Sequence, residues 1–120
     1  MIQGEFDEIG QLFFEIELMA ANGETLAVTA LLDTGSTEWL AINDQDLEFL
    51  EWPFLSGRDV VTGMGEASFN SYLATVVLDA QEFTVEAIAG SEFREIILGL
   101  PWLRTRRLVV DFPAGLLTLG

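Results

Sequence analysis

The sequence contains no cysteine, no histidine and no lysine among its 120 residues. Without cysteine it has no disulfides, no thiolate metal sites and no cysteine nucleophile. Without histidine it has no Ser-His-Asp chemistry and no imidazole ligand for a metal. Any catalysis by this chain must therefore rest mainly on carboxylates.

Basic residues of any kind are scarce. Five arginines stand against twenty acidic residues, so the formal net charge is −15. The cluster of Arg104, Arg106 and Arg107 is too small to reverse this balance and is typical of a solvated helix end. Such a chain should repel nucleic acid and anionic membranes, because it has no basic stripe to displace phosphate counterions. We expect neither as a partner.

Long apolar runs are missing as well. No uninterrupted apolar segment approaches the roughly 20 residues that span a bilayer. The first residues, MIQGEFDEIGQ, are acidic and lack the apolar core of a signal peptide. We therefore expect a soluble, cytoplasmic protein.

The residues that are present suffice to build a folded interior. Half of them are hydrophobic, including nine Phe and three Trp. By the usual size prior, residues 1–120 are predicted to form a single domain. The apolar content is high for so short a chain and leaves surplus surface for a partner copy.

Short strands separated by turn residues account for most of the chain. Alternating apolar and acidic residues at 14–18 predict a half-buried strand, and Asn22-Gly23 predicts a hairpin turn after it. Asn43 should cap a brief helix that runs to about Leu50, and Pro101 suits the first turn of another. The fold class is therefore predicted to be all-β with one or two short helices. Further strands are expected at 26–32, 39–42, 60–61, 72–78, 83–89, 96–99, 108–112 and 116–119.

The segment Leu31-Leu32-Asp33-Thr34-Gly35-Ser36 is the strongest candidate for chemistry. An acid directly after buried aliphatic residues costs several kcal/mol unless hydrogen bonds satisfy it. Thr34 and Ser36 offer hydroxyls, and Gly35 lets its backbone N–H approach the carboxylate closely. Taken alone, the last four residues of this segment, 33–36, are equally consistent with a strand that ends in an ordinary turn.

Two later segments change this interpretation. Thr62-Gly63-Met64-Gly65-Glu66 predicts a hairpin tip, and Ile96-Ile97-Leu98-Gly99 precedes a predicted helix. With these three motifs in this order, residues 12–119 resemble the single-domain, retropepsin-like aspartic peptidases of bacterial type. The closing VVDFPAGLLTL is similar to the end of such proteins. The resemblance implies a single-lobe closed β-barrel of the retropepsin or pepsin-lobe type.

The resemblance also implies a role for each motif. Asp33 would be the catalytic carboxylate, Thr34 would bond across a two-fold axis, and Gly35 would bind the substrate backbone. Ser36 would hydrogen-bond Asp33 and hold its orientation. The remaining positions would form a substrate-binding flap at Gly63, Met64 and Gly65, and core support under the site at Ile97, Leu98 and Gly99. The family uses neither a metal nor an organic cofactor, so none is expected.

Only one Asp-Thr-Gly occurs, whereas the mechanism of these enzymes requires two carboxylates. A chain of this length cannot hold two lobes, so the resemblance implies a homodimer with the cleft on its two-fold axis. We expect an endopeptidase that cleaves extended peptides or proteins at apolar sites. The apolar segment 116–119 is a candidate interface element.

The chain departs from its relatives at two points. Retroviral enzymes place an acid after the catalytic loop and an arginine after the later glycine, and here these positions are Thr37 and Leu100. That supporting ion pair is therefore predicted to be absent, with a neutral replacement. The flap tyrosine of pepsin-type enzymes has no match either, because Tyr72 lies past the glycines.

These departures leave other hypotheses open. A non-catalytic peptide-binding or dimerisation module on the same fold would form stable dimers and bind peptides without turnover. A carboxylate metal site around Asp44, Asp46 and Glu48 is a third interpretation. The segment NDQDLE does not match a calcium loop, however, and fits a solvated helix face better.

Overall fold

The computed structural model describes residues 1–120, apart from the side chain of Thr62. The predicted all-β class is confirmed, and the described helices are short. They are η1 (Asp44–Asp46), α1 (Leu47–Leu50) and η2 (Leu100–Arg104). The strands are β1 (Ile2–Gln3), β2 (Glu5–Phe6), β3 (Leu12–Met19), β4 (Thr25–Leu32), β5 (Leu40–Ile42), β6 (Phe54–Thr62), β7 (Gly65–Leu78), β8 (Gln81–Ala89), β9 (Ile96–Leu98), β10 (Leu108–Asp111) and β11 (Leu116–Leu119).

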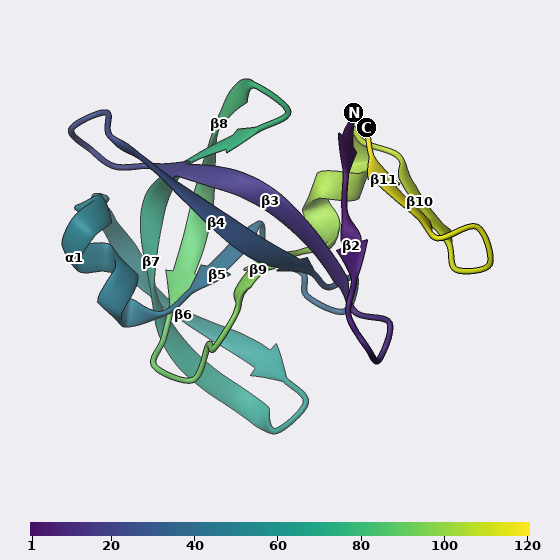
Figure 1. The fold of residues 1–120 in the computed structure, drawn as a ribbon. Helices are drawn as coiled ribbons and strands as arrows, with labels where there is room; N and C mark the ends of the chain where they lie inside the picture. Colours follow the sequence, from purple (N-terminus) through teal and green to yellow (C-terminus); the bar gives the residue numbers. More distant parts are fainter.

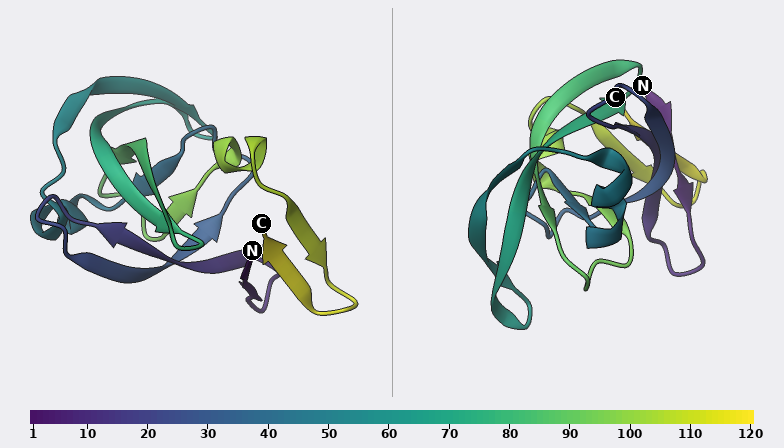
Figure 2. Two further views of the ribbon diagram at one scale, coloured as in Figure 1. Left: turned by 90° about the horizontal axis from the view of Figure 1, so that it is seen from above. Right: turned by 90° about the vertical axis from the view of Figure 1, so that its left-hand side faces the viewer.

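Most strands belong to one strongly curved sheet of eight (Figure 1). Its order is β2-β3-β4-β9-β5-β8-β7-β6, and β3 also pairs with β7. That extra pairing runs antiparallel over Glu17–Met19 and closes a ring in the order β3-β4-β9-β5-β8-β7. The β6–β7 hairpin extends away from this ring, as Figure 1 and the right-hand view of Figure 2 show.

A second, three-stranded sheet carries both chain ends, which lie side by side (Figure 1). Its order is β1-β11-β10, so β11 is the central strand and both of its edges are hydrogen-bonded within the chain. Leu117 and Leu119 are buried, whereas Leu116 is half exposed. The segment 116–119, expected as an interface element, is thus mainly part of the protein's own core.

The core follows the alternation that the sequence predicts. In β3 the apolar Phe14, Ile16 and Leu18 are buried, while Glu15 and Glu17 face solvent. The buried apolar residues form one large cluster and a smaller one of Ala41, Phe69 and Ile88. Each fully buried leucine or phenylalanine contributes roughly 1.5–3 kcal/mol. The largest fully buried members are Phe14, Leu18, Leu40, Ile42, Leu50, Leu78, Leu98, Trp102 and Leu119.

The local turn and cap signals have the expected outcomes. Gly23 has φ +90° in the turn between β3 and β4, a value that glycine adopts without strain. The side chain of Asn43 accepts a hydrogen bond from the Gln45 backbone N–H at 2.9 Å and so caps η1. Pro101 lies in the first turn of η2. None of the helices described is both long and apolar enough to cross a membrane.

Candidate active site

Asp33 follows β4 at the point where three strands meet. β9 pairs parallel with β4 and antiparallel with β5, so that Leu98 stands opposite both Leu32 and Leu40. These three leucines are buried, which fixes the end of β4. The Asp33 backbone N–H continues the ladder by donating to the Leu98 carbonyl at 2.9 Å. The sequence thus holds the backbone of an exposed aspartate on a rigid support.

The Asp33 carboxylate is oriented by the backbone of its own loop. Gly35 N–H donates to Asp33 Oδ1 at 2.8 Å, and a Cβ at position 35 would lie 3.1 Å from that oxygen. The Ser36 N–H donates to the Asp33 carbonyl at 3.1 Å. The Ser36 hydroxyl, however, accepts the Glu38 N–H at 3.3 Å. Among the described contacts, Gly35 therefore performs the orienting role that the family resemblance assigned to Ser36.

Gly99 lies directly against the Asp33 loop. A Cβ at this position would lie 2.8 Å from the Ser36 carbonyl oxygen and 3.0 Å from the Glu38 carbonyl carbon. The loop is also hydrogen-bonded to this segment, since Leu100 N–H donates to the Ser36 carbonyl at 2.8 Å. Glycine is required here because backbone passes against backbone. Gly99 supports the loop from beneath, as does the fully buried Leu98.

The glycine-rich segment forms the tip of the β6–β7 hairpin. β6 ends at Thr62 and β7 begins at Gly65, which has φ +109°. Gly63 and Met64 make the turn between them, and the Met64 side chain is fully exposed. The predicted hairpin tip is present, and it belongs to the segment that projects from the ring.

A cavity of about 250 Å³ lies between this hairpin and the Asp33 loop. One wall is polar and comes from the loop, including Asp33 and Glu38, while the other walls are apolar. Ile97 was expected only as core support, but its side chain also lines this cavity. The apolar lining comprises Ala41, Val60, Val61, Phe69, Ile88, Phe93 and Ile97. An exposed carboxylate thus stands beside a small apolar pocket.

The loop also carries an ion pair that the sequence analysis missed. Thr37 and Leu100 are uncharged. Glu38, which follows Thr37 in the chain, is only 8% exposed and binds Arg58 through both carboxylate oxygens. The Arg58 Nη2 donates to Glu38 Oε2 at 3.0 Å. The pKa of the Arg58 guanidinium is raised, chiefly by its hydrogen bond to Glu38 and against the effect of burial. Arg58 and Val60 lie two residues apart in β6 and so on one face of the strand, which is a signal that could have pointed to Arg58. No local pattern in the sequence indicates Glu38 as its partner.

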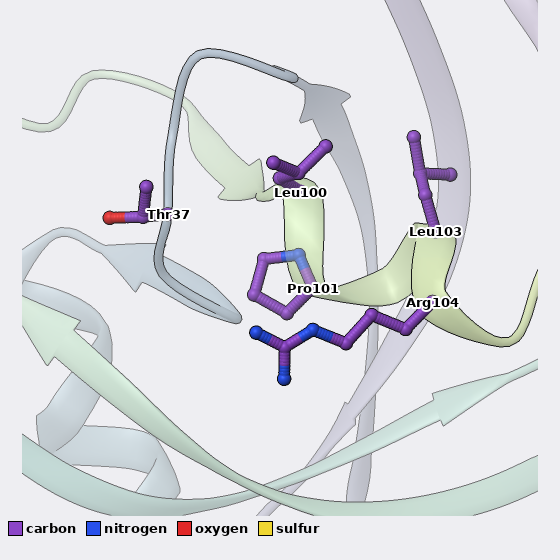
Figure 3. Close-up of a pocket in the computed structure, with 5 residues that line it drawn as sticks. All are labelled: Thr37, Leu100, Pro101, Leu103 and Arg104. Atoms are coloured by element: carbon purple, nitrogen blue, oxygen red, sulfur yellow. The ribbon is translucent and has the colours of Figure 1, made fainter.

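A second pocket of about 250 Å³ begins at the same loop (Figure 3). Thr37 contributes one side, and the apolar side chains of Leu100, Pro101 and Leu103 come from η2. The guanidinium of Arg104 extends across Pro101, as Figure 3 shows. Arg104 forms no ion pair with any acid that the structure describes. The pocket is therefore apolar, with one solvent-exposed guanidinium at its edge.

The third interpretation of the sequence placed a carboxylate metal site around Asp44, Asp46 and Glu48. Asp44 and Asp46 lie in η1, where acidic side chains complement the positive end of a short helix. Within the described part of the chain, no group of three or more acidic side chains is arranged to hold a metal ion. The groups described at Asp33 are its carboxylate, the backbone N–H of Gly35 and an apolar cavity.

Comparisons with known proteins agree with this geometry at the level of the fold. No protein-family model matches the chain, and no curated protein matches it in sequence. A retropepsin-like aspartic protease from Rickettsia conorii is similar in structure, with a TM-score of 0.65 and 18% identity over 99% of this chain and 91% of that one. The EIAV protease in complex with the inhibitor HBY-793 has a TM-score of 0.64 and 15% identity, over 82% and 90%.

The simian foamy virus (mac) protease is also similar, with a TM-score of 0.52 and 22% identity over 79% of this chain and all of that one. At such low identities the likeness concerns the course of the backbone. The chain therefore has the fold of the retropepsin-like aspartic proteases, as its motifs predicted.

Proposed function

We propose that this protein is an aspartic endopeptidase that acts as a homodimer, with Asp33 as its catalytic residue. The observation that carries the proposal is the Asp33 carboxylate itself. It is exposed, oriented by the Gly35 N–H, and placed at the rim of an apolar cavity. The retropepsin-like fold supports the same conclusion.

The chemistry requires a second carboxylate, which a second copy of the chain would supply. Two ionised carboxylates about 3 Å apart repel by about 5 kcal/mol at an effective dielectric constant of about 20. The two Asp33 side chains would therefore share one proton. The ionised one takes a proton from water as the water attacks the scissile carbonyl, and the protonated one polarises that carbonyl. Cleavage should accordingly be fastest at mildly acid pH.

The substrate would be an extended peptide with apolar side chains. A peptide that lies between the loop and the β6–β7 hairpin can bond to main-chain groups such as Gly35, in the manner of an added strand. The cavity beside Asp33 would take one apolar side chain, because its walls include Val60, Phe69 and Ile97. Gly63, Met64 and Gly65 would close over the peptide as a flap.

The second pocket suggests where the partner copy binds. A copy whose Asp33 approaches this Asp33 would also cover Thr34 and Thr37, which are exposed on the same loop. The pocket that begins at Thr37 would then lie in or beside the interface. Its apolar walls and the exposed Arg104, which forms no ion pair with the acids described, suit an apolar, acidic surface, and this chain with its charge of −15 presents many acids. Thr34 would be positioned to bond across the two-fold axis.

The test is cleavage of a complex peptide mixture, followed by mass spectrometry from mildly acid to neutral pH. The wild type is compared with Asp33→Asn, which keeps the shape of the side chain and removes its charge. Asp44→Asn is the matched control, since Asp44 is exposed in η1. We expect cleavage at apolar sites, reduced at least about a hundredfold in Asp33→Asn and unchanged in the control.

Equal cleavage by wild type and Asp33→Asn would refute the assignment of Asp33. If neither protein cleaves, although both are folded dimers that bind peptides, the non-catalytic module becomes the better description.

A further inference from the structure

The outer part of the β6–β7 hairpin has little support from the rest of the sheet. β8 pairs with β7 only from Asn70 onward, and β3 pairs with β7 only at Thr75–Val77. From Arg58 and Phe69 to the tip, the hairpin is thus a ribbon of two strands. Isolated two-stranded ribbons are at best marginally stable in water. Whatever holds the first pair of this ribbon determines how the hairpin lies over the cavity.

That first pair has one apolar and one ionic anchor. Phe69 is buried and packs on Phe93, with ring centroids 5.1 Å apart. Its cross-strand partner Arg58 reaches Glu38 on the Asp33 loop with both terminal nitrogens of the guanidinium. Nη1 of Arg58 also donates to Glu86 of β8 at 3.0 Å.

The ionic anchor leads directly to the candidate catalytic residue. Glu38 N–H donates to the Ser36 hydroxyl at 3.3 Å, and Ser36 N–H donates to the Asp33 carbonyl at 3.1 Å. Among the described side chains, Arg58–Glu38 is the ion pair that joins the hairpin to this loop. Glu38 is nearly buried, so its carboxylate depends on the guanidinium for compensation.

We propose that Arg58 is a positioning residue that fastens the β6–β7 hairpin to the Asp33 loop through Glu38. The hairpin is thereby arranged over the cavity before a peptide binds, and binding does not have to order it. This inference rests on the proposed peptidase function for its kinetic consequence. Its structural consequence, a stabilised ribbon, holds whether or not the protein cleaves peptides.

The test compares Arg58→Gln with Arg106→Gln. Arg106 forms an ion pair with Asp79, bonds to Gln81 and lies over the Phe83 ring, so the control also loses an arginine interaction. The first measurement is amide hydrogen exchange of the folded proteins. In Arg58→Gln we expect residues 59–68 to exchange roughly tenfold faster than in wild type, with other strands unaffected. In the control, this segment should exchange at the wild-type rate.

The second measurement is peptide cleavage. Without the pre-arranged hairpin, the protein should bind the peptide more weakly, and by the same amount, in the ground state and in the transition state. KM should therefore rise roughly tenfold while kcat stays within about twofold. Arg58→Lys keeps the positive charge but cannot make the bidentate contact with Glu38, so its KM should lie between those of the wild type and Arg58→Gln. The double variant Glu38→Gln with Arg58→Gln leaves no unpaired buried charge. It replaces Arg58→Gln where that variant folds poorly, and its KM should likewise be roughly tenfold above that of the wild type.

Unchanged exchange at 59–68 together with an unchanged KM would overturn the proposal. Faster exchange throughout the protein at an unchanged KM would also overturn it, because Arg58 would then act only on global stability. If the wild type itself cleaves no peptide, the proposed function fails, and hydrogen exchange alone decides the role of Arg58.

Discussion

Replacing Gly99 with alanine is the most direct test of how the Asp33 loop is supported. Gly99 has φ −96° and ψ −176°, an extended conformation that alanine adopts freely. Any cost of Gly99→Ala must therefore be steric. The new Cβ would lie 2.8 Å from the Ser36 carbonyl oxygen and closer still to that of Glu38. Both are backbone atoms, which cannot rotate away as a side chain would.

The magnitude follows from the tightness of this approach. Forcing an extra methyl group into a packed site typically costs about 1–3 kcal/mol, and more where the backbone must move. We expect Gly99→Ala to lower the free energy of unfolding by about 3 kcal/mol. The Asp33 loop must shift to relieve the contact. If Asp33 is catalytic as proposed, peptide cleavage should fall by at least about a hundredfold, since misplacing a reacting group by about 1 Å costs this much.

The assay is urea denaturation of the wild type, Gly99→Ala and Gly57→Ala, followed by cleavage assays at a fixed pH. Gly57 is the matched control, because a Cβ there would meet nothing within 4 Å and its φ is not positive. Gly57→Ala should stay within about 0.5 kcal/mol of the wild type or be slightly more stable. A Gly99→Ala protein as stable as the control would refute the close approach on which the account of the site depends.

Three further predictions address other parts of the molecule. Gly23→Ala should destabilise by about 1 kcal/mol in urea, because φ is +90° there and the space around it is open. The N-terminal ammonium and Arg106 lower the pKa of Asp79 below its ordinary 3.8. The interactions of the ionised Asp79 with these two cations therefore stabilise the fold above pH 3.8, and this stabilisation is lost as the pH falls further. Thermal unfolding of wild type and Asp79→Asn should therefore differ at neutral pH and converge in acid. Arg104→Glu should raise the dissociation constant of the proposed dimer at least tenfold in sedimentation equilibrium, and an unchanged constant would remove Arg104 from the proposed interface.

Much of the local structure was predictable because it follows from short patterns. The alternation at 14–18 predicted β3, and Asn22-Gly23 predicted its turn. The predicted strand at 60–61 was too short, since β6 begins at Phe54, and the brief strands β1 and β2 were not predicted at all. Exposed hairpin strands and two-residue strands carry too few alternating apolar positions to reveal themselves.

The sequence by itself determined the all-β class, the candidate aspartate and the hairpin tip, because each depends on residues that are neighbours in the chain. Only the tertiary structure decided what those features contact. The Glu38–Arg58 pair joins residues 20 apart, and the close approach of Gly99 to Ser36 joins residues separated by about half of the chain. Likewise, Ile97 lines the cavity and β11 is the centre of its sheet. Such contacts depend on strand order and register, which are set by how all apolar faces pack together, and no local pattern contains that information.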